Sequence, residues 1–166
     1  MNAPDDSGTD PARAAFYAGL PRKRCAAGAL ITDRQGWILI VEPSYKSVWE
    51  IPGGVVEAFE TASAACQREC REELGIDVPI GRLLVTEHQT DLGYRGDSIV
   101  FVYDGGILGG SDGIRIAEGE LESFRFVPAH DLGSLLSSKV ARRLMHNLAA
   151  RADGSCVELD NGVRRS

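Results

Sequence analysis

Three glutamates, Glu69, Glu72 and Glu73, lie close together in the stretch TASAACQRECREEL. In a helix, successive residues are rotated by about 100°, so Glu69 and Glu73 fall within about 40° of each other and Glu72 about 60° from Glu69. Like charges this close repel each other, and a bound divalent cation offsets the repulsion. The stretch therefore predicts a metal site on one face of a helix.

The ligand type predicts which metal binds there. Carboxylate oxygens are hard ligands, and no histidine or cysteine belongs to the set, which favours Mg²⁺, with Mn²⁺ as the alternative, over zinc. Mg²⁺ commonly shares its remaining positions with water and substrate phosphate, so we expect a phosphorylated substrate. The competing interpretation is that Arg68 and the glutamates only form ion pairs along the helix.

The spacing upstream of the glutamates favours the metal site over simple ion pairs. Gly54 is followed by five residues, Glu60, seven residues, and then the run RECREELGI, which starts at Arg68. This pattern resembles the signature box of the Nudix hydrolase family of MutT-like proteins. The segments VWEIPGGVVE and GELESFRFVPAHDL also resemble family segments, whereas Cys70 stands where the family usually has a bulky aliphatic residue.

The resemblance implies both a fold and an activity. The fold is of the α/β class, a Nudix-type α/β/α sandwich with a central mixed β-sheet. The activity is Mg²⁺-dependent hydrolysis of a phosphoanhydride bond in a nucleoside diphosphate derivative, such as a nucleoside triphosphate, oxidised or not. The alternatives are a dinucleoside polyphosphate, nucleotide-sugar or ADP-ribose pyrophosphatase, and a catalytically idle nucleotide-sensing domain. An isopentenyl diphosphate isomerase would need catalytic residues in longer insertions, which we cannot place here.

Roles for the residues of the box follow from the resemblance by position. Glu72 and Glu73 would be the principal metal ligands, and Glu69 would be a further ligand or the general base. Arg68 would orient a carboxylate through a charged hydrogen bond, as part of the catalytic set. Glu60 would support the loop or a metal-bound water.

Two further parts of the site lie outside the helix. The carbonyl of Gly53 or Gly54 could complete the coordination, and we expect Gly54 at the metal and Gly53 at the substrate. Some family members keep an additional catalytic or metal-binding glutamate just before the segment SFRF. Glu120 is our assignment for it, although Glu118 and Glu122 flank it and a solvated acidic loop is the alternative.

The substrate contacts are less well marked in the sequence. Trp49 and Tyr94 could stack a base, and Tyr94 lies near a position where dinucleoside polyphosphate hydrolases of this family tend to carry a tyrosine. An aromatic residue of this kind belongs to the core more often than it contacts a ligand. The ligand we expect is a nucleotide-type small molecule.

A rigid helix and a sheet must position these side chains. We expect a helix from Thr61 to Leu74, because the stretch lacks Gly and Pro, Thr61 can cap its start and Gly75 its end. Apolar runs predict the sheet: a hairpin from CAAGALITD and WILIVEP, a short strand over residues 48–51, strands in GRLLVTEHQT, DSIVFVYDGG and SFRFVP, and a last one in CVELDNG. Between these last two, residues 131–152 have helical spacing.

Length and charge limit the remaining choices. A chain of 166 residues suits one domain, which we place at residues 23–166 after a mobile N-terminal tail over residues 1–22. A net charge of -6 argues against a surface for long nucleic acid. The polar N-terminus does not resemble a secretory signal and no apolar run is long enough for a membrane, so we expect a cytoplasmic protein without a membrane partner. The sequence leaves open whether the protein forms a homodimer.

Overall fold

The computed structural model describes residues 10–90, 93–111 and 113–165. Its centre is a mixed sheet in the order β6-β2-β1-β5-β4-β7-β8, with β3 paired to β1 beside β2. The β1–β5 and β4–β7 pairs are parallel, and the other pairs are antiparallel. The strands are β1 (Arg24–Thr32), β2 (Ile38–Pro43), β3 (Gly53–Val55), β4 (Leu83–Gln89), β5 (Ser98–Ile107), β6 (Leu121–Val127), β7 (Val157–Asp160) and β8 (Val163–Arg164).

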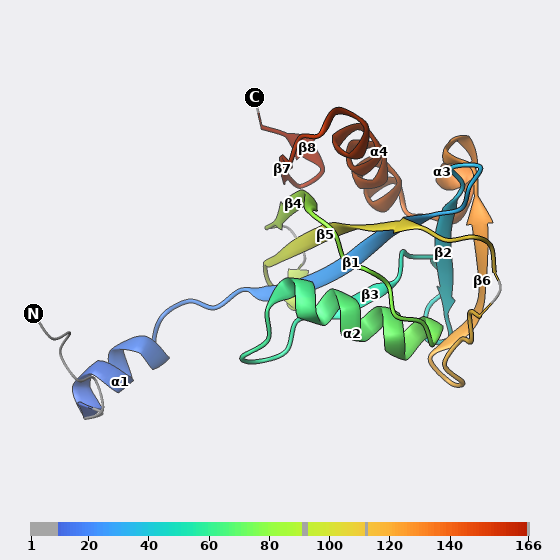
Figure 1. The fold of residues 1–166 in the computed structure, drawn as a ribbon. Helices are drawn as coiled ribbons and strands as arrows, with labels where there is room; N and C mark the ends of the chain where they lie inside the picture. The colour runs from blue at the N-terminus through green and yellow to red at the C-terminus, as the bar shows by residue number, and fades with distance from the viewer. Residues whose placement is uncertain (1–9, 91–92, 112, 166) are drawn as a thin grey trace, which may run out of the picture.

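Helices cover both faces of this sheet (Figure 1). The helix α2 (Ala62–Leu74) packs on one face, and α3 (Leu132–Leu135) and α4 (Ser138–Asp153) pack on the other. Along β1, Ala29 and Ile31 belong to the core beneath α2, whereas Leu30 belongs to the core beneath α4. The structure therefore confirms the predicted α/β/α sandwich with a central mixed sheet. The remaining elements are the helix α1 (Pro11–Ala18), which precedes β1, and two short 3₁₀ helices, η1 (Gly93–Arg95) and η2 (Ala129–Asp131).

The helix α2 has the bounds and caps that the sequence predicts. The Thr61 hydroxyl accepts a hydrogen bond from the Ala64 N–H, and Gly75 ends the helix in the left-handed conformation at φ 66°. Cys66, Cys70 and Leu74 are fully buried against the sheet. Because these residues fix which face of α2 is buried, they also fix where its glutamates point.

The strand predicted over residues 48–51 is wrong. Trp49 and Glu50 make only isolated bridges, and the strand β3 begins after Pro52, at Gly53. A Cβ on Gly53 would overlap backbone atoms of β1, and its φ of 146° disfavours other residues. Glycine therefore allows this segment to lie against β1, a non-local contact that β-propensity does not report.

The C-terminal and N-terminal segments refine the sequence-based description. The predicted helix over residues 131–152 is interrupted, and Ser137 caps the start of α4 by accepting from the Val140 N–H. In the N-terminal tail, α1 buries none of its residues and lies apart from the sheet (Figure 1). Residues 1–9 lie outside the described part, so the mobile tail stays a prediction. Within the described part of the chain, no helix has the length and apolar character to span a membrane.

Candidate metal-binding active site

The predicted glutamates of α2 lie on the helix face that meets β3. The Glu69 side chain keeps 17% of its surface exposed, whereas that of Glu72 keeps 52%. Between them, the Arg68 Nη1 donates to Glu69 Oε1 and to Glu72 Oε2, both at 2.9 Å. The structure thus brings these three residues together, and one arginine holds two carboxylates in fixed positions.

Arg68 is itself fixed by Glu60, which precedes the helix. Its Nε and Nη2 donate to the two oxygens of Glu60, each at 3.0 Å, and Nη2 also donates to the Val55 carbonyl at 3.0 Å. Glu60 accepts a further bond from the Glu57 N–H at 3.1 Å. The Arg68 guanidinium lowers the pKa of Glu60, and the Glu60 carboxylate in turn raises the pKa of Arg68. Glu60 therefore joins the loop to the helix.

The two glycines of β3 form the opposite wall. Gly53 donates its N–H to Glu73 Oε2 at 2.9 Å. A Cβ on Gly54 would overlap the carboxylate of Glu69, so only glycine fits beside that side chain. Glu69, Glu73 and the backbone of both glycines consequently meet in one small region, as the sequence predicted for the centre of the site.

Electrostatics sets this region apart from an ordinary acidic surface. Burial raises the pKa of Glu73 to about 7, and the charges of Glu69, Glu120 and Glu50 add to the effect. Burial also raises the pKa of Glu69, which the neighbouring Arg68 partly offsets. Hard oxygen donors that carry unfavourable negative charge suit a divalent cation such as Mg²⁺.

The carboxylates do not yet converge on one point. Within the described residues, no group of three His, Cys, Asp or Glu side chains is arranged to enclose a metal ion. Glu69 and Glu72 face Arg68, and Glu73 faces the N–H of Gly53. Binding of a cation would therefore require these side chains to turn from their present donors, and carboxylates can do this by rotation alone.

Glu120 lies just ahead of β6, in an exposed turn. Its charge contributes to the raised pKa of both Glu69 and Glu73, which places it near them. The Ser44 N–H donates to the Glu120 carbonyl at 2.9 Å and fixes this turn to the end of β2. The structure therefore brings Glu120 to the site, and its metal or catalytic role stays a prediction.

The two aromatic residues predicted to bind substrate lie elsewhere. Trp49 is only 6% exposed, and the Arg125 guanidinium covers its ring at 4.1 Å from the centroid. Tyr94 is 99% exposed in η1. Neither residue lines the pocket described next, so the structure does not bring them to the site.

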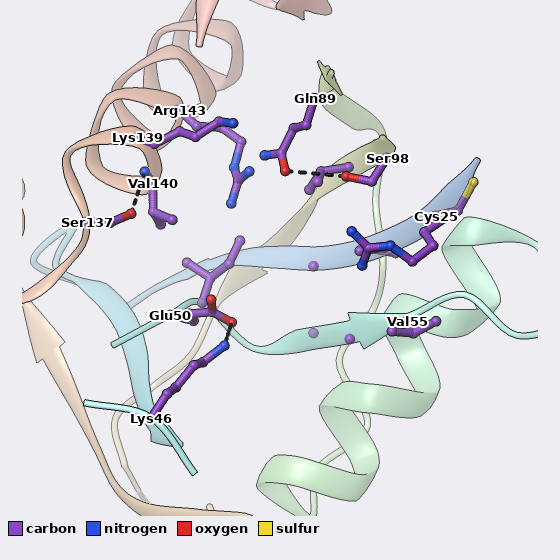
Figure 2. A pocket seen from close by; sticks show the side chains of 18 of the residues that line it. Cys25, Lys46, Glu50, Val55, Gln89, Ser98, Ser137, Lys139, Val140 and Arg143 are labelled. Carbon is purple, nitrogen blue, oxygen red and sulfur yellow. Dashed lines mark hydrogen bonds and ion pairs between the residues drawn. The ribbon is translucent and has the colours of Figure 1, made fainter. Parts of the chain in front are cut away.

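A pocket of about 390 Å³ lies beside Gly53 and Gly54, between β1, β3 and the start of α4 (Figure 2). Its polar lining includes Gln89 and Ser98 from the sheet and Lys139 and Arg143 from α4. The sequence analysis did not identify the residues of α4 as part of the site. One feature of the sequence could have indicated them: Arg143 lies at the edge of the apolar stripe of the helix predicted over residues 131–152.

Comparison with known proteins gives the family. A family model described as NUDIX domain matches residues 22–148. The CTP pyrophosphohydrolase of Escherichia coli (strain K12) is 39% identical over 71 residues, which cover 40% of this chain and 52% of that protein. The chain thus spans about half the length of this relative. A putative 8-oxo-dGTP diphosphatase 2 of Mycobacterium tuberculosis (strain CDC 1551 / Oshkosh) is 33% identical over 115 residues, 62% of this chain and 79% of that protein.

Solved structures agree with this result at the level of the fold. A crystal structure of UDP-X diphosphatase superposes with a TM-score of 0.72 at 20% identity, over 92% of this chain and 76% of that one. A MutT protein from Methanosarcina mazei Go1 superposes with a TM-score of 0.66 at 21% identity, over 81% of this chain and 99% of that one. Since the family model covers β1 to β6, α2 and most of α4, this chain belongs to the NUDIX domain family.

Proposed function

We propose that this protein is a Mg²⁺-dependent hydrolase that cuts a phosphoanhydride bond in a nucleoside diphosphate derivative, with nucleoside triphosphates as the first candidates. Mn²⁺ is the alternative metal. One observation carries the proposal: the partly buried carboxylates of Glu69 and Glu73, both with raised pKa, face the β3 glycines instead of open solvent. Such an arrangement is unfavourable unless a cation and its anionic ligand occupy the site.

The proposed mechanism assigns one task to each residue. A bound Mg²⁺ would supply Lewis acidity and neutralise charge on the phosphoryl oxygens. Glu72 and Glu73 would hold the metal, and Gly54 would let the backbone approach it. Glu69 removes the proton from the attacking water, and its raised pKa brings it closer to the value that suits a general base near neutral pH.

The remaining residues of the proposed site support these ligands. Arg68 holds Glu69 and Glu72 in orientation through hydrogen bonds of 2.9 Å. Glu60 fixes Arg68 in turn. Glu120 is the alternative general base or a further ligand, because its charge acts on both Glu69 and Glu73.

The relatives' names do not agree on one substrate. They mention CTP, 8-oxo-dGTP and UDP-X. Dinucleoside polyphosphates and nucleotide sugars or ADP-ribose therefore stay alternatives for this chain, and a nucleotide-type small molecule is the expected ligand in each case. A panel of these compounds assayed with Mg²⁺ or Mn²⁺, with product identification, would show which bond is cut.

The metal site is tested by Glu72→Gln and Glu73→Gln. Each change removes a charged ligand while nearly keeping the side-chain shape, so the far-ultraviolet circular dichroism should stay unchanged. We expect Mg²⁺-dependent release of phosphate or pyrophosphate to fall by more than the roughly 100-fold that loss of an outer-shell partner can cost. Glu118→Gln, an exposed acid flanking Glu120, is the matched control and should keep full activity. Full activity in both ligand variants would contradict the assignment.

A further inference from the structure

Arg143 carries an unused hydrogen-bond donor at the wall of the pocket. Its side chain keeps only 9% of its surface exposed, and its Nη1 donates to Glu87 Oε2 at 2.6 Å. The Nε, by contrast, has no acceptor among the described residues. Figure 2 shows the guanidinium extending from α4 toward β1, into the space that the pocket residues surround. A buried donor without an acceptor costs free energy, so a missing partner is expected there.

The partner must be able to accept hydrogen bonds from a guanidinium. The Nε edge of arginine presents two parallel N–H groups that match two oxygens of a phosphate or carboxylate. Glu87 is fully buried and does not line the pocket, so it lies behind Arg143 and holds it in orientation. Glu87 Oε1 also lacks a donor, so this ion pair leaves one donor of Arg143 uncommitted beside the pocket that Arg143 lines.

Positive charge around this edge favours an anion. Lys139 also lines the pocket and makes no ion pair with any described residue. The first turn of α4 stands at the same wall, where Ser137 caps the helix, and the positive end of a helix favours anions. The lining also holds the carboxylate of Glu50, which Lys46 pairs at 2.8 Å, so four basic side chains face one acidic side chain in a chain of net charge -6.

The lining does not suit a nucleobase. Among the described residues that line the pocket, Tyr45 is the one aromatic side chain. It is 76% exposed, and Lys46 lies over its ring at 5.1 Å from the centroid. A base normally stacks on an aromatic face, and the one ring in this lining is already contacted by Lys46.

We propose that this pocket binds a phosphoryl group of the substrate beyond the scissile anhydride, with Arg143 and Lys139 as the residues that select it. The inference rests on the proposed hydrolase function, because Gly53 and Gly54 separate the pocket from the glutamates of α2. Substrates in which the group linked to the nucleoside diphosphate itself carries phosphate are then preferred. Nucleotide sugars, whose linked group is neutral, bind less well.

Binding of inorganic pyrophosphate tests the pocket without catalysis. Calorimetric titrations are run with a chelator present, so that no metal at the glutamates can recruit the anion. We expect binding to wild-type protein that weakens with added salt and weakens about tenfold in Lys139→Gln and in Arg143→Lys, since lysine keeps the charge but loses the planar fork. Arg142→Gln makes the same charge change on the next residue of α4, outside the pocket, and should bind like wild type.

Substitution of Arg143 needs its own control, because it leaves the buried carboxylate of Glu87 without its partner, and this destabilises the folded protein. The double variant Arg143→Met with Glu87→Gln removes both charges and should fold while losing pyrophosphate binding. Equal affinity of wild type, Lys139→Gln and Arg143→Lys would overturn the proposed anion site. So would undetectable binding by wild-type protein.

Hydrolysis assays separate this inference from the proposed function. Wild-type protein should favour a nucleoside triphosphate or dinucleoside polyphosphate over a nucleotide sugar in kcat/KM, and Lys139→Gln should reduce that ratio mainly through KM. Hydrolysis with no preference for the phosphorylated group would overturn the inference and leave the hydrolase standing. Pyrophosphate binding that depends on Arg143, in a protein inert toward every anhydride, would support the anion site and overturn the hydrolase.

Discussion

The contact between Gly54 and Glu69 shows how closely the site depends on single atoms. The carboxylate of Glu69 occupies the volume where any other residue at position 54 would place its Cβ. Neighbouring Gly53 is constrained in a different way, by its φ of 146° and by the backbone of β1. The two glycines of β3 are therefore required for separate physical reasons: Gly54 leaves room for the Glu69 carboxylate, and Gly53 leaves room for the backbone of β1.

Gly54→Ala should displace Glu69 without unfolding the protein. The added methyl group overlaps a side-chain carboxylate, which can rotate away, and not a backbone atom. We expect a loss of Mg²⁺-dependent activity of about 10- to 100-fold, as for other groups that orient ligands. Steady-state kinetics measures this loss. Gly133→Ala, where nothing lies within 4 Å of the new Cβ, is the control and should keep activity. Unchanged kinetics in Gly54→Ala would show that Glu69 has no catalytic part.

Glu73 should make the stability of the metal-free protein depend on pH. Burial above all raises its pKa from 4.5 to about 7, so the folded state binds more protons than the unfolded state between these values. The free energy of unfolding from this group is therefore highest below pH 4.5 and falls as the pH rises to about 7. The difference should be about 1–2 kcal/mol, since one pKa unit is about 1.4 kcal/mol and solvent screens a partly buried group.

Urea unfolding of chelator-treated protein between pH 4.5 and 8 measures this effect. Glu73→Gln cannot titrate, so its unfolding free energy should lack the fall that wild type shows over this range. Glu118→Gln should follow wild type. A wild-type curve with the same slope as Glu73→Gln would mean that the carboxyl of Glu73 is not perturbed in the folded protein.

At the scale of one element, α2 holds the glutamates because both of its ends are fixed locally. Thr61 caps the first turn, and Gly75 in the left-handed conformation ends the last. The buried side of the helix then presses Cys66 and Cys70 on the sheet. The caps therefore affect the geometry of the site indirectly, because they stabilise the helix that carries Glu69, Glu72 and Glu73.

Thr61→Ala should lower the free energy of unfolding by about 1 kcal/mol, because the Ala64 N–H loses its acceptor. Gly75→Ala should cost a similar amount through its positive φ. Chemical denaturation measures both, and kcat at a temperature where each variant is folded should stay near wild type. Gln67→Ala, on the exposed face of the same helix, is the control. Wild-type stability in both cap variants would show that α2 is held by its packing alone.

Features that depend on residues close together in the sequence could be predicted, whereas features that depend on residues far apart in the sequence could not. The bounds of α2, its buried stripe and the cluster of Arg68 with Glu69 and Glu72 depend on neighbours within two turns, and they were predicted correctly. The strand at residues 48–51 was wrong, because the position of β3 depends on the backbone of β1. The pocket was missed for the same reason: Arg143 and Gly53 line one pocket only after α4 has packed on the sheet.

At the scale of the whole molecule, two helical layers enclose one sheet, and residues 10–23, the described part of the chain ahead of β1, contribute to neither core. In α1, Phe16 and Tyr17 contact each other edge to face and stay mostly exposed. The C-terminal end differs, because β7 contributes Val157 and Leu159 to the core beneath α4. The two ends of the chain therefore have different structural roles.

Removal of residues 1–20 should change the free energy of unfolding by less than about 0.5 kcal/mol, as expected for surface changes, and should leave activity unchanged. Removal of residues 157–166 is the contrasting deletion and should prevent stable folding, since two buried side chains are lost. Thermal and chemical denaturation measure both. A large loss of stability in the N-terminal deletion would show that the tail packs on the domain, and the proposed boundary near residue 23 would be wrong.

The parallel pairing of β1 with β5 has a consequence for the order in which the site forms. Arg24 pairs with Ser98, so the middle of the sheet closes only after a long stretch of chain, α2 included, has been gathered in. Closures over such distances are slow, and they set the folding rate of many domains. During synthesis, β1 would lack its parallel neighbour β5 until residues 98–107 have emerged. The proposed cation site should then form late, together with the completed sheet.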